Sequence, residues 1–257
     1  MTLPPAAVPA VAGLCGLLLG SFLNVCIFRL PRGVSVVWPA SACGGCKREL
    51  RWFENIPIVS WVVLGARCAR CKAPISIQYP LVEAVTAVLF VVVAAVTPVG
   101  PLLAARLIFV CALIVLFAID LEHQILPNVI TLPGISVGLA FALLGPPGWR
   151  AALLGALLGG GLLYATAASY YLLRKEEGLG MGDVKMLAMI GAFLGWQAVL
   201  LTLVLASFSG ALIGLLLIAL QRGSMKYALP FGTFLALGAL VAMLAGQPII
   251  DWYAGFY

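Results

Sequence analysis

Two aspartates stand at the edges of long apolar runs. Asp120 ends one run and Asp183 begins another. An ionisable residue at membrane depth is by default a hypothesis of function. If the two carboxyl groups lie close together they can share a proton, so that one activates water while the other donates to a carbonyl oxygen. The structural alternative is that Asp183 is an N-cap residue and Asp120 a charge at the membrane edge.

The residues around Asp183 favour a catalytic role for the two aspartates over a structural one. It ends the sequence Gly180-Met181-Gly182-Asp183, a G-x-G-D pattern. Glycines at these positions permit a tight turn into the following helix and leave room for a substrate backbone. We therefore predict Gly180 and Gly182 as substrate-binding residues beside a catalytic pair, Asp120 and Asp183.

Helix direction predicts how the pair divides its work. Asp183 would begin a helix, whose partial positive charge favours an ionised carboxylate, whereas Asp120 would end one. On this argument Asp183 is the general base acting on water, and Asp120 is the acid facing the scissile carbonyl.

A second group of reactive residues consists of four cysteines in two C-x-x-C pairs. Twenty-one residues separate the pairs, whose members are Cys43, Cys46, Cys68 and Cys71. Four thiolates suit tetrahedral Zn²⁺, although the separation slightly exceeds the usual window of about 15 to 20. Two disulfides, an iron–sulfur or redox role and the absence of any cofactor are the alternatives; disulfides rarely persist in a reducing cytosol. A Cys₄ site is coordinatively closed, so we expect the zinc to be structural.

The composition determines the setting of both groups. Of 257 residues, 63% are hydrophobic and 9% are charged, whereas an average soluble domain has about 25% charged residues. This excludes a disordered chain and argues strongly against a soluble domain. We predict an all-α polytopic membrane protein with about eight transmembrane helices and a zinc-binding cytoplasmic loop after the first. The net charge of +6 is then explained by cytoplasmic loops, and no nucleic-acid partner is expected.

Eight apolar segments are candidates for these helices. The uncharged stretch from Met186 to Leu220 is too long for one crossing of a bilayer core of about 30 Å. We break it at Gly195-Trp196-Gln197, which makes the sixth segment unusually short. The predicted segments are Val11–Phe28, Leu81–Thr97, Leu102–Asp120, Asn128–Leu144, Trp149–Leu173, Gly182–Trp196, Ala198–Leu220 and Leu229–Ala245.

The distribution of basic residues predicts the orientation. With the N-terminus outside, alternating helices place 13 of the 15 Lys and Arg residues inside, and leave only Arg106 and Arg150 toward the outside. Both aspartates then lie at cytoplasmic helix ends. We divide the chain into a first transmembrane helix (1–29), a cytoplasmic Cys₄ loop (30–80) and a second transmembrane region (81–257). Gly16/Gly20 and Gly155/Gly159 predict close helix packing.

Several motifs in order resemble those of the bacterial type IV prepilin peptidases, membrane aspartic proteases of the GxGD kind. Besides the two aspartates and the cysteine pairs, they are Gly20-Ser21-Phe22-Leu23-Asn24-Val25, Arg29-Leu30-Pro31, Glu54-Asn55-Ile56-Pro57, Tyr79-Pro80-Leu81-Val82-Glu83 and Pro230-Phe231-Gly232. The chain departs from the family at Gly44, Asn128 and Thr233, where the family often has Pro, Asp and Pro.

The resemblance implies a two-step enzyme in the bacterial inner membrane. Members of the family cleave the leaders of prepilins and pseudopilins after a Gly on the cytoplasmic side. They then commonly methylate the new amino terminus with S-adenosylmethionine. Carried over, Asp120 and Asp183 are the catalytic pair and the four loop cysteines hold zinc. The resemblance also implies that residues 81–257 are the peptidase domain and that the loop 30–80 is associated with methyl transfer. The methyl-donor site cannot be read from spacing; we expect it near the zinc loop and the neighbouring helix ends.

Three other functions compete with this one. A peptidase without methyltransferase activity shares every motif. A transporter using the two aspartates for protons or cations would favour inverted repeats and charges in mid-membrane, which the sequence lacks. A non-enzymatic assembly protein with a zinc-stabilised docking loop would leave the paired aspartates and the G-x-G-D pattern unexplained.

Overall fold

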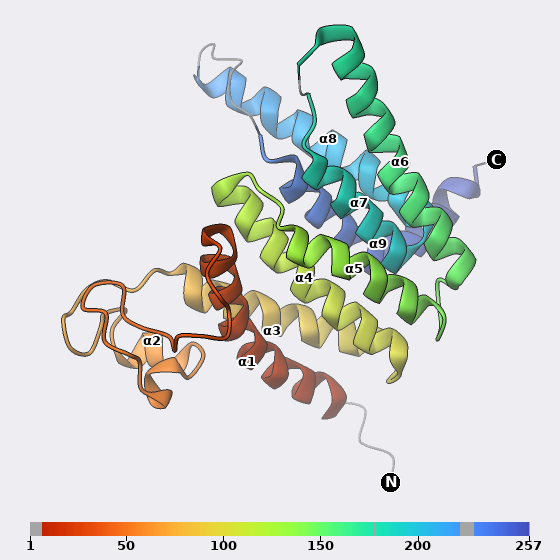
Figure 1. Cartoon of the computed structure of the whole chain (residues 1–257). Helices are drawn as coiled ribbons and strands as arrows, with labels where there is room; N and C mark the ends of the chain where they lie inside the picture. Colours follow the sequence, from red (N-terminus) through yellow and green to blue (C-terminus); the bar gives the residue numbers. More distant parts are fainter. Residues whose placement is uncertain (1–6, 177, 222–228, 257) are drawn as a thin grey trace. The chain divides into compact units, whose positions relative to one another are not determined.

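The computed structural model describes residues 7–176, 178–221 and 229–256, and most of these are helical. The chain divides into two compact units, residues 1–115 and 116–257, which are described separately. The first contains α1 (Ala7–Arg29), η1 (Leu30–Arg32), η2 (Trp52–Asn55), α2 (Val59–Val63), α3 (Gln78–Val96) and most of α4 (Pro101–His123). The second contains the end of α4, then α5 (Asn128–Ala142), α6 (Trp149–Arg174), α7 (Met181–Leu194), α8 (Trp196–Gln221) and α9 (Phe231–Ala254). Figure 1 shows these elements along the chain.

Each of the eight predicted apolar segments is a helix, which confirms the all-α membrane class. Six helices are long and apolar enough to cross a membrane, namely α1, α3, α4, α6, α8 and α9. The other two, α5 and α7, have 15 and 14 residues. Eight crossings therefore remain a prediction. Among the basic residues placed inside, Arg222 and Lys226 lie outside the described residues.

The predicted break between the sixth and seventh segments is confirmed. Helix α7 ends at Leu194 and α8 begins at Trp196. Between them Gly195 has a φ of +83°, which a residue with a Cβ rarely adopts, and its N–H bonds to Gly191 O at 2.8 Å. The glycine thus ends one helix and lets the chain turn directly into the next.

Helix α7 forms the core of the second unit. Its residues from Met186 to Phe193 are all buried, and it packs against α5, α6, α8 and α9. Fourteen residues span only about 21 Å, less than the bilayer core of about 30 Å. A helix enclosed by other helices does not have to match the lipid thickness, which explains how so short a segment fits among longer ones.

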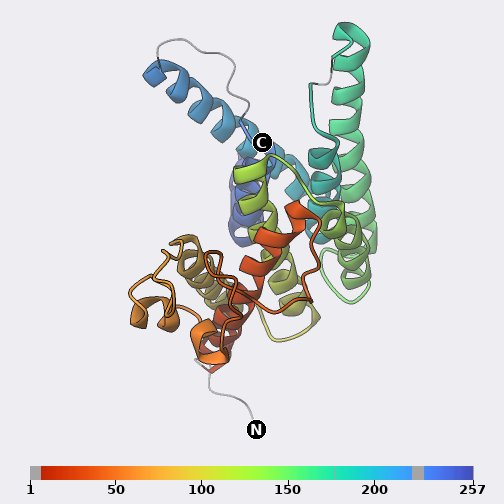
Figure 2. The same cartoon turned by 60° about the vertical axis from the view of Figure 1, so that its left-hand side comes forward.

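Closely spaced glycines let the helices of each unit touch, as predicted. In the second unit α6 and α7 lie side by side in both views (Figures 1 and 2). A Cβ on Gly155 would lie 2.5 Å from Gly191 O, and one on Gly159 would lie 2.6 Å from Leu187 O. In the first unit, Gly16 and Gly20 bring α1 against the backbone of α3 in the same way. Small residues serve here as contact surfaces between helix backbones.

The segment between α1 and α3 is a loop with short helices, anchored in the first unit by buried polar groups. Glu83 of α3 accepts a hydrogen bond from the Ile58 N–H at 2.7 Å. Asn24 of α1 donates from Nδ2 to Tyr79 O at 3.0 Å. Ile58 has a φ of +60°, a strained conformation for a β-branched residue. The bond to Glu83 thus holds the loop in a geometry that it would not otherwise favour.

Candidate active site and cysteine cluster

Three helix ends of the second unit meet around the predicted catalytic pair. Asp120 lies in the last turn of α4 and is 4% exposed. Its Oδ2 accepts hydrogen bonds from the Thr233 N–H at 2.7 Å and the Thr233 Oγ1–H at 3.1 Å, at the start of α9. Asp183, in the first turn of α7, is half-buried and close enough to interact electrostatically with Asp120. The structure therefore brings the two aspartates together.

Glycines and one leucine set the spacing of these helix ends. A Cβ on Gly182 would lie 2.9 Å from Leu126 Cβ. A Cβ on Gly232 would lie 2.9 Å from both Leu126 Cδ1 and Asp120 Oδ2. The Leu126 side chain thus fills the space that both glycines leave. This gives Gly182 a packing role, while substrate binding by Gly180 and Gly182 stays a prediction.

The hydrogen bonds to Asp120 oppose the division of labour predicted from helix ends. Thr233 is the third residue of α9, so Asp120 caps the N-terminus of α9 as well as ending α4. Hydrogen bonds to a charged group contribute about 1.5–3 kcal/mol each, and an exposed helix terminus about 0.3–1 kcal/mol. These bonds favour negative charge on Asp120, which is the opposite of the division predicted from α4 and α7 alone, because that prediction did not include α9.

Asn128 and Lys185 connect two more elements at this edge of the unit. Lys185 Nζ donates to Asn128 Oδ1 at 2.9 Å, joining the start of α7 to the start of α5. The neutral amide accepts this bond without adding a third acidic group beside the two aspartates. In this chain the residue that departs from the family pattern, Asn128, thus makes a contact to Lys185.

The four loop cysteines of the first unit form one cluster. Their Sγ atoms all lie within 4.8 Å of one another, and Cys43 Sγ is 3.7 Å from Cys71 Sγ. Tetrahedral zinc with Zn–S bonds of about 2.3 Å requires sulfur atoms about 3.8 Å apart. The cluster therefore fits a Cys₄ zinc site, and Cys43, Cys46, Cys68 and Cys71 would be its ligands.

The two cysteine pairs are copies of one backbone motif, a repeat 25 residues apart that sequence reasoning missed. Cys43 N–H bonds to Arg48 O at 2.9 Å, and Cys68 N–H bonds to Ala73 O at 2.9 Å. A single antiparallel bridge closes each turn, between Ala42 and Glu49 and between Arg67 and Pro74. Each pair is thus a self-contained metal knuckle.

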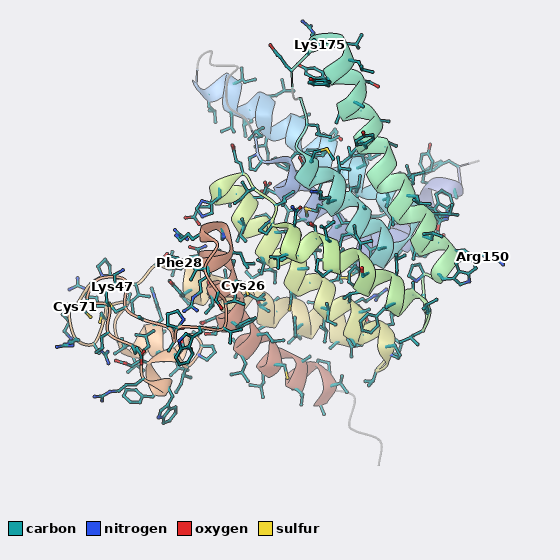
Figure 3. The ribbon with its side chains drawn as sticks, viewed as in Figure 1. Cys26, Phe28, Lys47, Cys71, Arg150 and Lys175 are labelled. Atoms are coloured by element: carbon teal, nitrogen blue, oxygen red, sulfur yellow. The ribbon has the colours of Figure 1, made fainter. Side chains whose placement is uncertain are left out.

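A lysine completes each knuckle. Lys47 and Lys72 directly follow the second cysteine of their pairs, and both have positive φ, +57° and +59°. Their N–H groups bond to the carbonyls of Cys43 and Cys68 at 2.9 and 3.1 Å. Figure 3 shows Lys47 beside Cys71 of the other knuckle. The shared C-x-x-C-K pattern was the sequence signal for the repeat.

Each knuckle also prepares the thiol of its first cysteine to bind metal, whereas desolvation and neighbouring thiols raise the pKa of Cys71. Backbone N–H groups of Cys71 and Arg70 point at the Cys68 sulfur and lower the pKa of that thiol to about 6. In the first knuckle the N–H groups of Cys46 and Gly45 likewise lower the pKa of Cys43. Since metals bind thiolates, these donors favour the ligating form near neutral pH.

The chain matches two family models and several characterised proteins. Residues 14–97 match the Bacterial Peptidase A24 N-terminal domain, and residues 107–215 match the Type IV leader peptidase family. A Prepilin leader peptidase/N-methyltransferase of Aeromonas hydrophila is 39% identical over 267 residues, covering 93% of this chain and 91% of the relative. One of Pseudomonas aeruginosa is 37% identical over 272 residues, covering 95% and 92%. One of Myxococcus xanthus is 44% identical over 211 residues, covering 81% and 62%.

No solved structure matches the chain. The relatives nevertheless align with it over nearly its whole length, through both the cysteine loop and the segments that carry the two aspartates. The chain belongs to the type IV leader peptidase family.

Proposed function

We propose that this protein is a membrane aspartic endopeptidase that removes the leaders of type IV prepilins and pseudopilins, cutting after a Gly. The observation that carries the proposal is the pairing of Asp120 with Asp183 at the meeting point of α4, α7 and α9. The relatives' shared name supplies the substrate class, since each is a prepilin leader peptidase/N-methyltransferase. The pair lies at helix ends, where a leader outside the bilayer can reach it.

The pair performs peptide hydrolysis by general acid–base catalysis. Asp120, whose charge Thr233 stabilises, takes a proton from water as the oxygen attacks the scissile carbonyl carbon. Asp183 gives its proton to the carbonyl oxygen, which forms a neutral tetrahedral diol. Asp120 then returns a proton to the leaving amine while the diol transfers one to Asp183. The carbon–nitrogen bond breaks, and both carboxyl groups regain their starting states.

We propose that the second step methylates the new amino terminus with S-adenosylmethionine. Zinc in the Cys₄ cluster has no open coordination position, so its contribution is to fold the loop between α1 and α3. We further place the protein in the bacterial inner membrane with its N-terminus outside. The loop and the aspartates then face the cytoplasm, from which a prepilin leader is presented.

The proposal is tested with purified protein in lipid, a synthetic prepilin and methyl-labelled S-adenosylmethionine. Mass spectrometry should show the leader released by cleavage after Gly and the mature chain heavier by one methyl group. Unmodified mature chain would limit the protein to the peptidase step. An intact prepilin, with a relative's enzyme active in parallel, would refute the peptidase assignment.

A further inference from the structure

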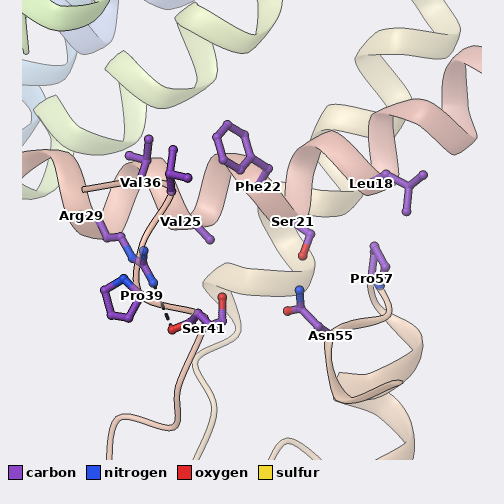
Figure 4. A pocket seen from close by; sticks show the side chains of 12 residues that line it. Leu18, Ser21, Phe22, Val25, Arg29, Val36, Pro39, Ser41, Asn55 and Pro57 are labelled. Carbon is purple, nitrogen blue, oxygen red and sulfur yellow. Dashed lines mark hydrogen bonds between the residues drawn. The ribbon is translucent and has the colours of Figure 1, made fainter. Parts of the chain in front are cut away.

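A cavity in the first unit lies between α1 and the cysteine-containing loop. It has a volume of about 470 Å³ and is bounded by one face of α1 and by loop residues 36–41, 55 and 57. Small-molecule sites commonly have about 300–1,000 Å³. The cavity thus has the capacity for a compact organic ligand (Figure 4).

One stripe of α1 provides the long wall of this cavity. Leu18, Ser21, Val25 and Arg29 recur every three or four residues and so lie on one face of the helix. Ser21 and Arg29 are eight residues apart, or about 12 Å along the axis. Figure 4 shows the Arg29 guanidinium at one end of the cavity, and Ser21 facing Asn55 further along. The cavity is therefore elongated, with a cationic end and a neutral polar end.

The polar groups that line the cavity are available to a ligand. The side chains of Asn55 and Ser41 have no hydrogen-bond partner among the residues that the structure describes. Arg29 donates to Ser35 O at 2.9 Å and to Ala40 O at 3.4 Å, from one nitrogen each. A guanidinium has five N–H donors, so it retains others for a carboxylate.

The neutral end is held in place by a buried carboxyl group. Glu83 of α3 accepts a hydrogen bond from the Ile58 N–H at 2.7 Å, and it lies close enough to the Ser21 side chain to interact with it. It therefore ties the loop that carries Asn55 to the α1 face that carries Ser21. The cavity walls are fixed before a ligand binds, which lowers the entropic cost of binding.

We propose that this cavity binds S-adenosylmethionine, an inference that rests on the methyl-transfer step of the proposed function. Arg29 binds the carboxylate of the amino-acid part. The Asn55 amide, which both donates and accepts, binds the edge of the adenine, and apolar residues including Leu18 and Pro57 cover the rest. A nucleoside triphosphate fits less well, because among the described residues Arg29 is the one cation lining the cavity.

The place of the cavity suits the reaction. It lies along the second half of α1, a candidate membrane span, beside the polar loop. In the proposed function the acceptor amine is the new amino terminus of the cleaved prepilin, which is released on the same side as the loop. The lone pair of the amine nitrogen forms a bond to the methyl carbon of S-adenosylmethionine as the bond between that carbon and sulfur breaks. The bonding electrons return to sulfur, and the amine loses a proton to water.

Binding is measured directly, with the full-length protein in lipid and tritiated S-adenosylmethionine as the probe. Arg29→Ala and Asn55→Ala should each weaken binding about tenfold, which corresponds to the loss of one hydrogen bond to the probe, or about 1.4 kcal/mol. Ser41→Trp should abolish it by filling the cavity without removing a contact. Arg32→Ala is the matched control, because Arg32 stacks on Phe28, does not line the cavity and should bind the probe within twofold of wild type.

Photocrosslinking of the bound probe provides a second readout. Labelled peptides should come from residues 18–29, 36–41 or 52–57. Unchanged binding by Asn55→Ala and Ser41→Trp, with labels elsewhere, would overturn the cavity assignment and leave the proposed methyl transfer intact. If the wild-type protein cleaves prepilin but neither binds the probe nor transfers a methyl group, both the cavity assignment and the proposed methyl transfer are refuted. Thermal unfolding of Arg29→Ala shows whether this variant loses binding because it misfolds, since the substitution also removes the Arg29 bonds to Ser35 and Ala40. Ser41→Trp and Asn55→Ala leave those bonds in place.

Discussion

At the residue scale, the two aspartates differ in their partners. Asp120 receives two hydrogen bonds from Thr233, whereas Asp183 has Asp120 as an electrostatic neighbour. Sequence alone identified the pair, because acidic side chains are rare in apolar segments and one stood in a G-x-G-D pattern. It could not identify Thr233, which is 113 residues from Asp120 and reaches it only through tertiary packing.

In the proposed mechanism the pair acts as a unit, so losing either member should stop catalysis. Asp120→Asn or Asp183→Asn should lower kcat for leader cleavage by at least about a hundredfold, because each removes a general acid or base. Asp251→Asn is the control, since Asp251 bonds Gln247 at the end of α9 and should leave cleavage unchanged. Cleavage near the wild-type rate by either catalytic variant, measured by mass spectrometry, would disprove an aspartic mechanism.

Thr233 should tune this catalysis and is not required for it. Thr233→Val keeps the backbone N–H but loses the hydroxyl, which removes one donor from Asp120. Less stabilisation of negative charge means that Asp120 ionises less readily, so the acidic limb of the kcat/KM profile should move to higher pH by up to about one unit. Thr233→Ser keeps both donors and should retain the wild-type profile. An unmoved limb in Thr233→Val would remove Thr233 from the mechanism.

At the element scale, the sequence predicted helices better than loops. Continuous apolar runs and the Gly195-Trp196-Gln197 break located the helices. The two knuckles are built from backbone hydrogen bonds and left-handed lysines, which leave little trace in hydropathy. Their short C-x-x-C-K repeat was visible in the sequence, but it predicts geometry only when both copies are compared.

The knuckles should hold one zinc ion per chain. Cys43→Ser combined with Cys46→Ser removes half of the ligands, so metal analysis should show zinc lost. Proteolysis between residues 30 and 80 should become faster, because the metal offsets the small apolar content of the loop. Cys15→Ser, in α1 and outside the cluster, should retain the metal. Stoichiometric zinc in the double variant would disprove the Cys₄ assignment.

Glycine contacts between α6 and α7 should matter for stability. Gly159→Ala would place a Cβ 2.6 Å from the backbone of Leu187 and should cost about 1–3 kcal/mol through overpacking. Gly161→Ala, in the same helix with no atom within 4 Å of the added carbon, should be neutral or slightly stabilising. Thermal unfolding in one detergent compares the two. Equal melting temperatures would show that α6 and α7 can move apart to admit the added carbon without a loss of stability.

At the scale of the whole molecule, our proposals place two chemical tasks in two parts of the chain. The cysteine cluster and the proposed methyl-donor cavity belong to residues 1–115, and the aspartate pair belongs to residues 116–257. The two matched family models lie one in each region, apart from the first residues of the second model. Composition alone could predict a membrane protein, but the assignment of tasks required the tertiary neighbours of each reactive residue.

Orientation in the membrane is the remaining whole-molecule prediction, and α6 is the helix on which to test it. Arg150 lies near its first residue and Lys175 just beyond its last, at opposite ends of a helix of 26 residues (Figure 3). Such a helix is about 39 Å long and can cross a core of about 30 Å. Positive charges concentrate in the cytoplasmic segments. Alkaline phosphatase fused after Arg150 should therefore be active, because it lies in the periplasm. Green fluorescent protein fused after Lys175 should be fluorescent, because it lies in the cytoplasm. Fusions after Leu50, within the cysteine loop, should behave like those at Lys175. The reverse pattern would place the aspartates and the cysteine cluster outside, where a prepilin leader does not reach them.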